Sequence, residues 1–144
     1  TINVTLPTDG TYFIRIENPD GGAVRSSTAL LTVSDAPTWT TAAGSLGSIA
    51  AGSSVSLSVA GTSDSTVAYS ETTAVLTSNT DTPASTMNLS LNSSTGAITG
   101  TAPSPTSETT YNFTLRLTDA ESQTTDRAFS ITVTTGINNG GQFN

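Results

Sequence analysis

The stretch TYNFTLRLTDAESQTTDRAFSITV, residues 110–133, alternates apolar and polar side chains on both sides of the polar segment DAESQTTD. A period of two residues is typical of a β-strand that buries one face. The apolar positions are Tyr111, Phe113, Leu115, Leu117, Phe129, Ile131 and Val133. The stretch therefore predicts an antiparallel hairpin with one buried face and one solvated face.

A similar pattern occurs near the start of the chain, in TYFIRIENPDGGAVRSSTALLTV, residues 11–33. Arg15 corresponds to Arg116 at an offset of 101 residues, and Val33 corresponds to Val133 at an offset of 100. A repeat near 100 residues matches the length of an immunoglobulin-type β-sandwich domain. The chain is therefore expected to contain two related hairpins, each at the end of such a domain.

The repeat also defines the expected domain organisation. Residues 1–35 are expected to be the last two or three strands of an incomplete domain, because an isolated hairpin is marginally stable. Its other strands would come from preceding residues or from a neighbouring molecule. Residues 36–135 are expected to form one complete domain after the short hinge Asp35-Ala36-Pro37. Residues 136–144 are a Gly- and Asn-rich tail that we expect to be flexible, with Phe143 as an exposed terminal side chain.

The predicted fold class is all-β: an immunoglobulin-like β-sandwich preceded by the terminal strands of a second, incomplete immunoglobulin-like domain. Turn residues separate alternating segments every 8–12 positions, and no segment keeps the 3.6-residue apolar period of a helix. The expected strands are Thr38–Thr41, Ser45–Ile49, Ser54–Val59, Thr66–Ser70, Ala74–Ser78, Met87–Leu91, Ala97–Thr99, Thr110–Thr118 and Thr125–Thr134. Their expected core is Trp39, Leu46, Val55, Leu57, Val59, Tyr69, Leu89, Leu91, Ile98, Phe113, Leu115, Leu117, Phe129, Ile131 and Val133.

The chain is unusually rich in hydroxyl side chains, with 30 Thr and 21 Ser among 144 residues. Such a composition, with few large aliphatic residues, would also suit a disordered chain. The regular alternation and the sparse charge favour strands instead, because β-branched Thr suits the solvated face of a sheet. We therefore interpret the Ser and Thr residues as the outer faces of strands.

The charged residues exclude several classes of function. The chain has no Cys, His or Lys, four Arg, eleven acidic residues and a net charge of −7. The lack of Cys and His removes common nucleophile–base pairs and the usual zinc ligands. The scarcity of basic residues argues against nucleic acid and against an anionic membrane surface as partners. No apolar run approaches the ~20 residues that cross a bilayer.

The segment LNSSTGAITGTAP, residues 91–103, resembles the pattern L-x-x-S-T-G-x-I-x-G-T-P of putative immunoglobulin-like, cadherin-like domains. The resemblance covers about residues 36–135 and includes the later hairpin, with Ala102 as an extra residue before Pro103. Gly96 and Gly100 flank a very short strand, and each is expected to adopt a conformation closed to other residues. The motif is therefore expected to shape a corner of the sandwich, with Ile98 pointing into the core.

The first unit carries a second resemblance. YFIRIENPDGG, residues 12–22, is similar to the end of an IPT/TIG-type immunoglobulin-like domain, in which an Asn-Pro-Asp-Gly turn joins the last two strands. Tandem arrays of these two types, rich in Thr and Ser and poor in Lys, look like virion proteins of tailed phages and like bacterial surface proteins. The resemblance implies display, spacing or adhesion.

Asp119, Glu121 and Asp126 form the acidic cluster of the second hairpin. Cadherin-like relatives bind Ca²⁺ with acidic turn residues at domain junctions, so the resemblance implies a candidate Ca²⁺ site here. Ca²⁺ takes six to eight oxygen ligands, which three carboxylates cannot supply without help. A solvated hairpin turn that needs no cofactor is the alternative that we favour.

The remaining polar and aromatic candidates have structural interpretations. Trp39, Tyr69 and Tyr111 would suit a sugar platform, but in a small sandwich they are expected in the core. Asp64, Glu71 and Asp81 are dispersed in Ser/Thr-rich loops and form no acid–base pair. Four Asn-x-Ser/Thr sequons occur at a frequency that chance explains, and they begin at Asn3, Asn88, Asn92 and Asn112.

These observations predict a non-enzymatic structural or display protein, with no catalytic residue. The expected place is a virion surface, in a phage fibre, tail or capsid decoration, where the module would give spacing and weak adhesion. The expected partners are other virion or surface proteins in a multimeric array, together with a host-surface glycan. The alternatives are a segment of a bacterial cell-surface adhesin and a subunit of a self-assembling extracellular filament.

Overall fold

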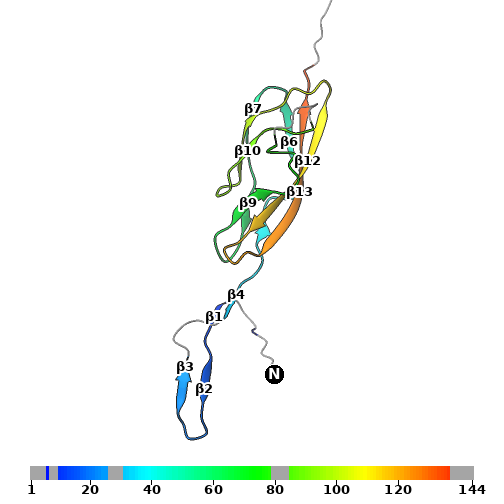
Figure 1. Ribbon diagram of the computed structural model, residues 1–144. Coiled ribbons are helices and arrows are strands. Elements are labelled where there is room, and N and C mark those ends of the chain that lie inside the picture. The colour runs from blue at the N-terminus through cyan, green and yellow to red at the C-terminus, as the bar shows by residue number, and fades with distance from the viewer. Residues whose placement is uncertain (1–5, 7–9, 26–30, 79–84, 137–144) are drawn as a thin grey trace, which may run out of the picture. The chain divides into compact units, whose positions relative to one another are not determined.

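The computed structural model describes residue 6 and residues 10–25, 31–78 and 85–136. The chain divides into two compact units, Thr1–Asp35 and Ala36–Asn144 (Figure 1). Every regular element in the described part is a β-strand, which confirms the all-β prediction. No described helix is long and apolar enough to cross a membrane. Of the expected tail, residues 137–144, which include Phe143, lie outside the described residues.

The first unit consists of two short antiparallel pairs. β1 (Gly10–Tyr12) pairs with β4 (Leu31–Val33), and β2 (Arg15–Glu17) pairs with β3 (Ala23–Arg25). The turn between β2 and β3 contains the Asn-Pro-Asp-Gly segment. It is closed by a hydrogen bond from the Asn18 N–H to the Gly22 carbonyl oxygen at 2.7 Å. That these strands are the end of an IPT/TIG-type domain stays a prediction.

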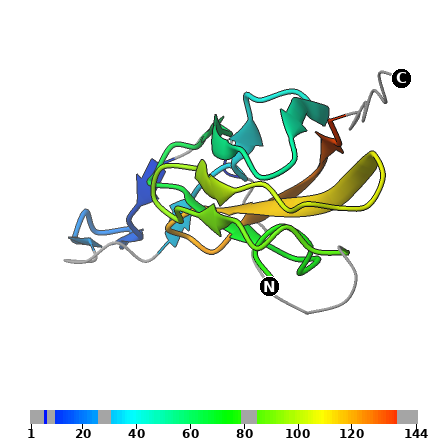
Figure 2. The ribbon, with the colours of Figure 1, turned by 90° about the horizontal axis from the view of Figure 1, so that it is seen from above.

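The second unit is a two-layer sandwich (Figures 1 and 2). Its strands are β5 (Thr38–Trp39), β6 (Gly44–Ala50), β7 (Ser54–Ser58), β8 (Gly61–Thr62), β9 (Ala68–Glu71), β10 (Ser90–Leu91), β11 (Ala97–Thr101), β12 (Thr109–Thr118) and β13 (Thr124–Thr134). One sheet has the order β6-β13-β12-β9 and the other has the order β10-β11-β7, while β5 and β8 form a separate pair. All neighbours are antiparallel except β6 and β13, which run parallel.

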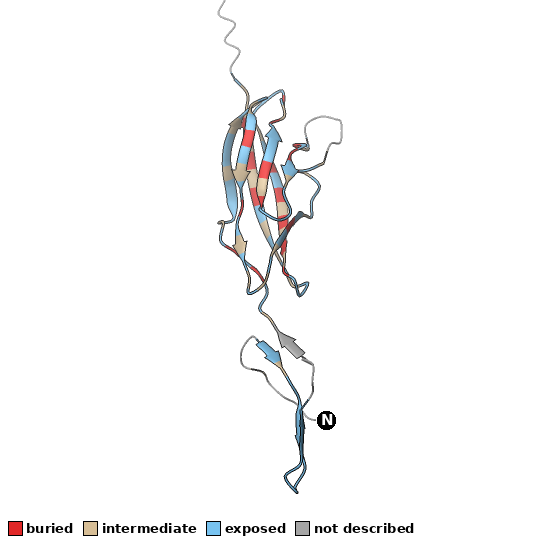
Figure 3. Ribbon diagram, turned by 90° about the vertical axis from the view of Figure 1, so that its left-hand side faces the viewer, coloured by how far each residue is buried: buried red, intermediate tan, exposed pale blue. Residues whose placement is uncertain are grey.

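The core lies between these two sheets, and its residues alternate with more exposed ones along β12 and the second half of β13 (Figure 3). Most of the expected core residues are buried, and the large apolar residues of β12 and β13 are at most 3% exposed. Leu46, Leu57 and Leu91 are only partly buried and pack against this core. Leu76, Met87 and Ala102 are buried although the strand pattern did not place them in the core. The outward residues are largely Ser and Thr, as the composition indicated.

The expected strand Ala74–Ser78 is absent, because this segment forms a series of bends instead. The cause is Glu71 at the end of β9. Its carboxylate accepts hydrogen bonds from the backbone N–H groups of Val75, Leu76 and Thr77 at 2.6–2.9 Å. Three successive N–H groups that point to one carboxylate cannot also point sideways to a neighbouring strand. The bend places Leu76 in the core with no exposed surface.

The corner around Asn92–Gly100 has the conformation that its glycines indicated. Gly96 has φ of +70° and Gly100 has φ of +143°. The Asn92 side-chain oxygen accepts hydrogen bonds from the N–H groups of Ser94 and Thr95, which closes the turn before β11. A Cβ atom on Gly96 would collide with the Val59 carbonyl oxygen. The corner therefore requires glycine both for backbone conformation and for space.

Candidate functional site

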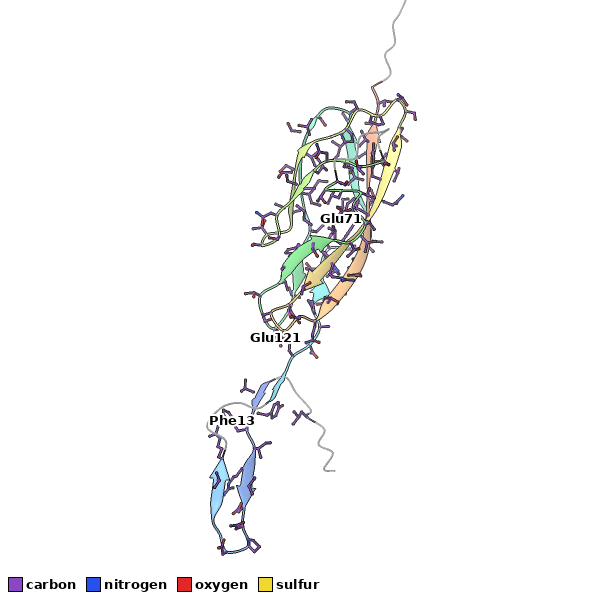
Figure 4. The ribbon with its side chains drawn as sticks, in the orientation of Figure 1. Phe13, Glu71 and Glu121 are labelled. Atoms are coloured by element: carbon purple, nitrogen blue, oxygen red, sulfur yellow. The ribbon has the colours of Figure 1, made fainter. Side chains whose placement is uncertain are left out.

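An acidic cluster lies where the β12–β13 turn meets the loop between β8 and β9. The pairing of Thr118 in β12 with Ala68 in β9 brings these two loops to the same end of the sheet. Two hydrogen bonds join the loops through Ser65. Its hydroxyl donates to Glu121 Oε2 at 2.6 Å and accepts from the Ala120 N–H at 3.1 Å. Glu121 lies at this end of the second unit (Figure 4).

The cluster consists of Asp64, Asp119 and Glu121, each with a carboxylate oxygen within 4.8 Å of the other two. Asp119 is only 6% exposed. Its Oδ1 accepts a hydrogen bond from the Gln123 N–H at 2.7 Å. Its Oδ2 is buried and accepts no hydrogen bond from the part of the chain that the structure describes. A buried carboxylate oxygen without a donor costs free energy, and a bound cation would remove that cost.

Asp126, the third residue of the expected site, belongs to a different interaction. Arg116 Nε donates to Asp126 Oδ1 at 2.7 Å, and Arg116 Nη2 donates to Asp126 Oδ2 at 2.8 Å. The two residues are directly opposite each other in β12 and β13. The hydrogen bond from Arg116 holds the pKa of Asp126 below its usual value. The structure therefore brings Asp119 and Glu121 together with Asp64 and leaves Asp126 on the outer face of the sheet.

Sequence reasoning missed Asp64 as a member of this cluster because it lies 55 residues before Asp119. No local pattern connects the two residues. Only the pairing of β9 with β12 brings their loops together, and this pairing is a property of the sandwich topology.

The aromatic candidates are core residues, as expected. Trp39, Tyr69 and Tyr111 are at most 7% exposed. The Trp39 ring contacts the rings of Tyr69 and Phe129 edge-on, with centroids 5.9 and 5.3 Å apart. Its indole N–H donates to the Thr125 carbonyl oxygen at 3.0 Å. These rings are therefore buried and cannot form an exposed platform for a sugar.

The other polar candidates do not form a site among the described residues. The Glu71 carboxylate accepts a hydrogen bond from the Leu76 N–H in the bend after β9, and the Asn92 side-chain oxygen accepts one from the Ser94 N–H in the turn before β11. Asn88 has a positive φ of 51°, and Asn112 is exposed on β12. Asp81 and Asn3 lie outside the described residues.

The two facing sheets and the polar exterior define the class of this molecule as an immunoglobulin-like β-sandwich module. The family model described as "Putative Ig domain" matches residues 36–134. The chain belongs to this family. No curated protein matches its sequence.

Solved structures of cadherin domains have a similar fold. A structure of protocadherin gamma B7 extracellular cadherin domains 1–4 has a TM-score of 0.51 and 14% identity. The alignment covers 91% of this chain and 41% of that one. PcdhgB3 EC1–4 also has a TM-score of 0.51, with 13% identity, 90% coverage of this chain and 40% of that chain. Many cell-surface domains share this architecture. The fold is thus typical of extracellular structural and adhesion modules, which are typically non-enzymatic.

Proposed function

We propose that the protein is a non-enzymatic structural and display module of a virion component, in a fibre, tail or capsid decoration. The observation that supports this most is the contrast between the interior and the exterior of the second unit. The large aliphatic and aromatic side chains of β12 and β13 are almost completely buried. Its surface carries mainly Ser, Thr and acidic residues. Such a module keeps its neighbours at a fixed spacing and presents polar loops.

In this role each module makes only weak contacts, with other virion proteins and with a glycan on the host surface. Many copies on one particle would convert these weak contacts into strong attachment, because each bound copy raises the effective concentration of the next. The same properties suit a bacterial cell-surface adhesin or an extracellular filament, which remain the alternatives.

The location is tested by immunogold electron microscopy with an antibody raised against residues 36–135. Gold on discrete heads, tails or fibres of particles would support the virion role. Gold on cell envelopes would replace it with the adhesin, and gold along continuous fibrils would replace it with the filament subunit. A multimerised form of the chain should also bind whole cells or a glycan array, whereas the single chain should bind weakly or not at all.

We propose in addition that the Asp64, Asp119 and Glu121 cluster takes Ca²⁺. The burial of Asp119 supports this role, together with its Oδ2 atom, which has no hydrogen-bond partner among the described residues, since Ca²⁺ takes carboxylate oxygens as ligands. Water, backbone carbonyl groups or another chain segment would complete the six to eight ligands. The cation would hold two loops together that are now joined through Ser65.

Calcium is expected to raise the melting temperature of the protein by several degrees. At a concentration about 100-fold above Kd, a ligand of the folded state adds about 2.7 kcal/mol to the free energy of unfolding. The measurement is thermal unfolding of the full chain in Ca²⁺ and in chelator. Asp119→Asn should abolish the response. Asp126→Asn, in the same hairpin but outside the cluster, should retain it. An unchanged melting temperature, or equal responses of the two variants, would exclude this site.

A further inference from the structure

A hollow of about 410 Å³ lies on the outer face of the four-stranded sheet, where β6, β13 and β12 run side by side (Figure 1). Phe113 and Phe129 pair with each other there, and both side chains are buried in the core. Their backbone therefore forms the floor of the hollow, and Gly44, which pairs with Phe129 on its other side, adds no side chain. Small-molecule sites typically have volumes of about 300–1,000 Å³, so a small ligand fits this space.

The rim of the hollow is polar. Asn112 in β12 lies directly opposite Ser130 in β13, and the next outward pair is Thr114 and Ala128. Thr73 continues the rim beyond β12, where its hydroxyl accepts a hydrogen bond from the Thr114 N–H at 3.1 Å. None of the described residues that line the hollow is charged. The hollow thus combines hydroxyl and amide groups with a small apolar surface.

The polar side chains of the rim differ from those of the neighbouring pairs on the same face. On one side of the hollow, the hydroxyls of Thr110 and Thr132 share a hydrogen bond at 2.9 Å. On the other side, Arg116 donates two hydrogen bonds to the Asp126 carboxylate. Between these pairs, the rim side chains of β12 and β13 form no hydrogen bond with the described part of the chain. The unused hydrogen-bonding groups therefore coincide with the hollow.

The chemistry of the rim indicates the class of ligand. Each hydroxyl both donates and accepts, and the Asn112 amide supplies two donors and an acceptor oxygen. A neutral saccharide carries the same mixture of donors and acceptors, and the C–H groups of its ring can pack on Ala128. A metal ion would find no carboxylate among the described lining residues. A phosphate or sulfate would find no cationic side chain there, because Arg116 on the next pair is bound to Asp126.

We propose that this hollow is a binding site for a neutral saccharide. The proposal rests on the proposed attachment to a host-surface glycan, and it names the face of the module that makes the contact. The rim residues are exposed or half-buried, so a bound sugar stays in contact with water and each contact is weak. Many copies on one particle would add such contacts together. The groups that bind the sugar are held by paired strands, which fix their positions better than loops would.

The site is tested by NMR titration of the isotopically labelled full chain with glucose, galactose, mannose and N-acetylglucosamine, and with glucuronic acid as a charged probe. At least one neutral sugar should shift the amide resonances of residues that line the hollow, and glucuronic acid should not. The multimerised chain should likewise bind neutral glycans on an array. Shifts at a different surface, stronger binding of the charged probe, or no binding of any neutral sugar in either measurement would overturn the proposal.

Two variants connect the binding to the hollow. Ala128→Ile fills the space with a residue that suits a strand and should weaken binding about tenfold or more. Asn112→Thr removes the amide, keeps a β-branched residue and should also weaken binding. Thr124→Ile, on the same face of β13 but outside the hollow, should bind as the wild type does.

The outcomes separate this site from the proposed function. If the multimerised wild type and Ala128→Ile bind the same glycan equally well, the hollow is not the site, although attachment to a glycan stands. If immunogold labelling places the chain away from particles while the hollow binds sugar, the virion role fails and the site stands.

Discussion

Replacement of Gly96 by Ala is expected to destabilise the second unit by about 2–5 kcal/mol. The φ of +70° at Gly96 places any L-residue in the left-handed region, which costs roughly 1–2 kcal/mol. The added Cβ would also collide with the Val59 carbonyl oxygen and approach the Tyr69 ring. Relief of such overpacking typically costs another 1–3 kcal/mol, because backbone has to move. Chemical unfolding of the full chain, followed by the fluorescence of Trp39, measures the loss.

Gly52 provides the matched control for this prediction. Its φ of +72° is nearly the same, but the nearest atom to an added Cβ is Ser104 Oγ at 3.6 Å. Gly52→Ala should therefore show the conformational cost alone, about 1–2 kcal/mol. If Gly96→Ala loses no more stability than Gly52→Ala, the backbone around Gly96 moves to accept the added Cβ atom. The contact with the Val59 carbonyl oxygen would then contribute nothing to the loss.

Replacement of Glu71 by Gln is expected to cost about 2–4 kcal/mol at neutral pH. The carboxylate accepts three backbone hydrogen bonds and two more from the hydroxyls of Thr73 and Thr77. An amide has one acceptor oxygen, so its NH₂ group would face N–H donors. Hydrogen bonds to a charged group contribute about 1.5–3 kcal/mol, and buried donors without partners add to the loss. Glu108→Gln, at an exposed position, should change stability by at most about 0.5 kcal/mol.

The same carboxylate predicts a pH dependence. Burial raises the pKa of Glu71. The hydrogen bonds from the backbone N–H groups of Leu76, Thr77 and Val75 together lower this pKa by a larger amount, so the net pKa lies below the ordinary 4.5. A lowered pKa in the folded state means that the unfolded state binds the proton more readily. The stabilisation is therefore complete above pH ~4.5 and is lost as the pH falls through the folded-state pKa. The stability difference between wild type and Glu71→Gln should shrink over this acid range. A difference that stays constant with pH would contradict the role of the charge.

The sequence predicted those parts of the fold in which local alternation and burial agree. In β12 and β13 the large apolar residues all face the core, so the hairpin itself follows from the pattern. The pattern does not predict Arg127, which lies on the same side of β13 as Phe129 and donates to the Thr41 carbonyl oxygen at 2.6 Å. The same logic failed at Ala74–Ser78, where alternating residues suggested a strand. There a single side chain, Glu71, binds the backbone N–H groups that a strand would need, and alternation carries no sign of such a contact.

The acidic cluster shows the second limit of sequence reasoning. The turn residues Asp119 and Glu121 could be recognised as candidates because they are close in sequence. Asp64 joins them through strand pairing, and Asp126 leaves them because it lies opposite Arg116. A carboxylate site in a sandwich is thus decided by register between strands. Register depends on the whole core and cannot be read from one segment.

The parallel pairing of β6 with β13 has a mechanical consequence. β6 lies near the beginning of the second unit and β13 near its end, and they are joined side by side from Gly44–Phe129 to Ala50–Thr134. Tension applied to the two ends of the unit would pull these strands in opposite directions along their own axes. The load would then be shared by all the hydrogen bonds between them at once, rather than breaking them one after another. A module connected in this way resists stretching, which is what a tether between a particle and a surface would require under flow.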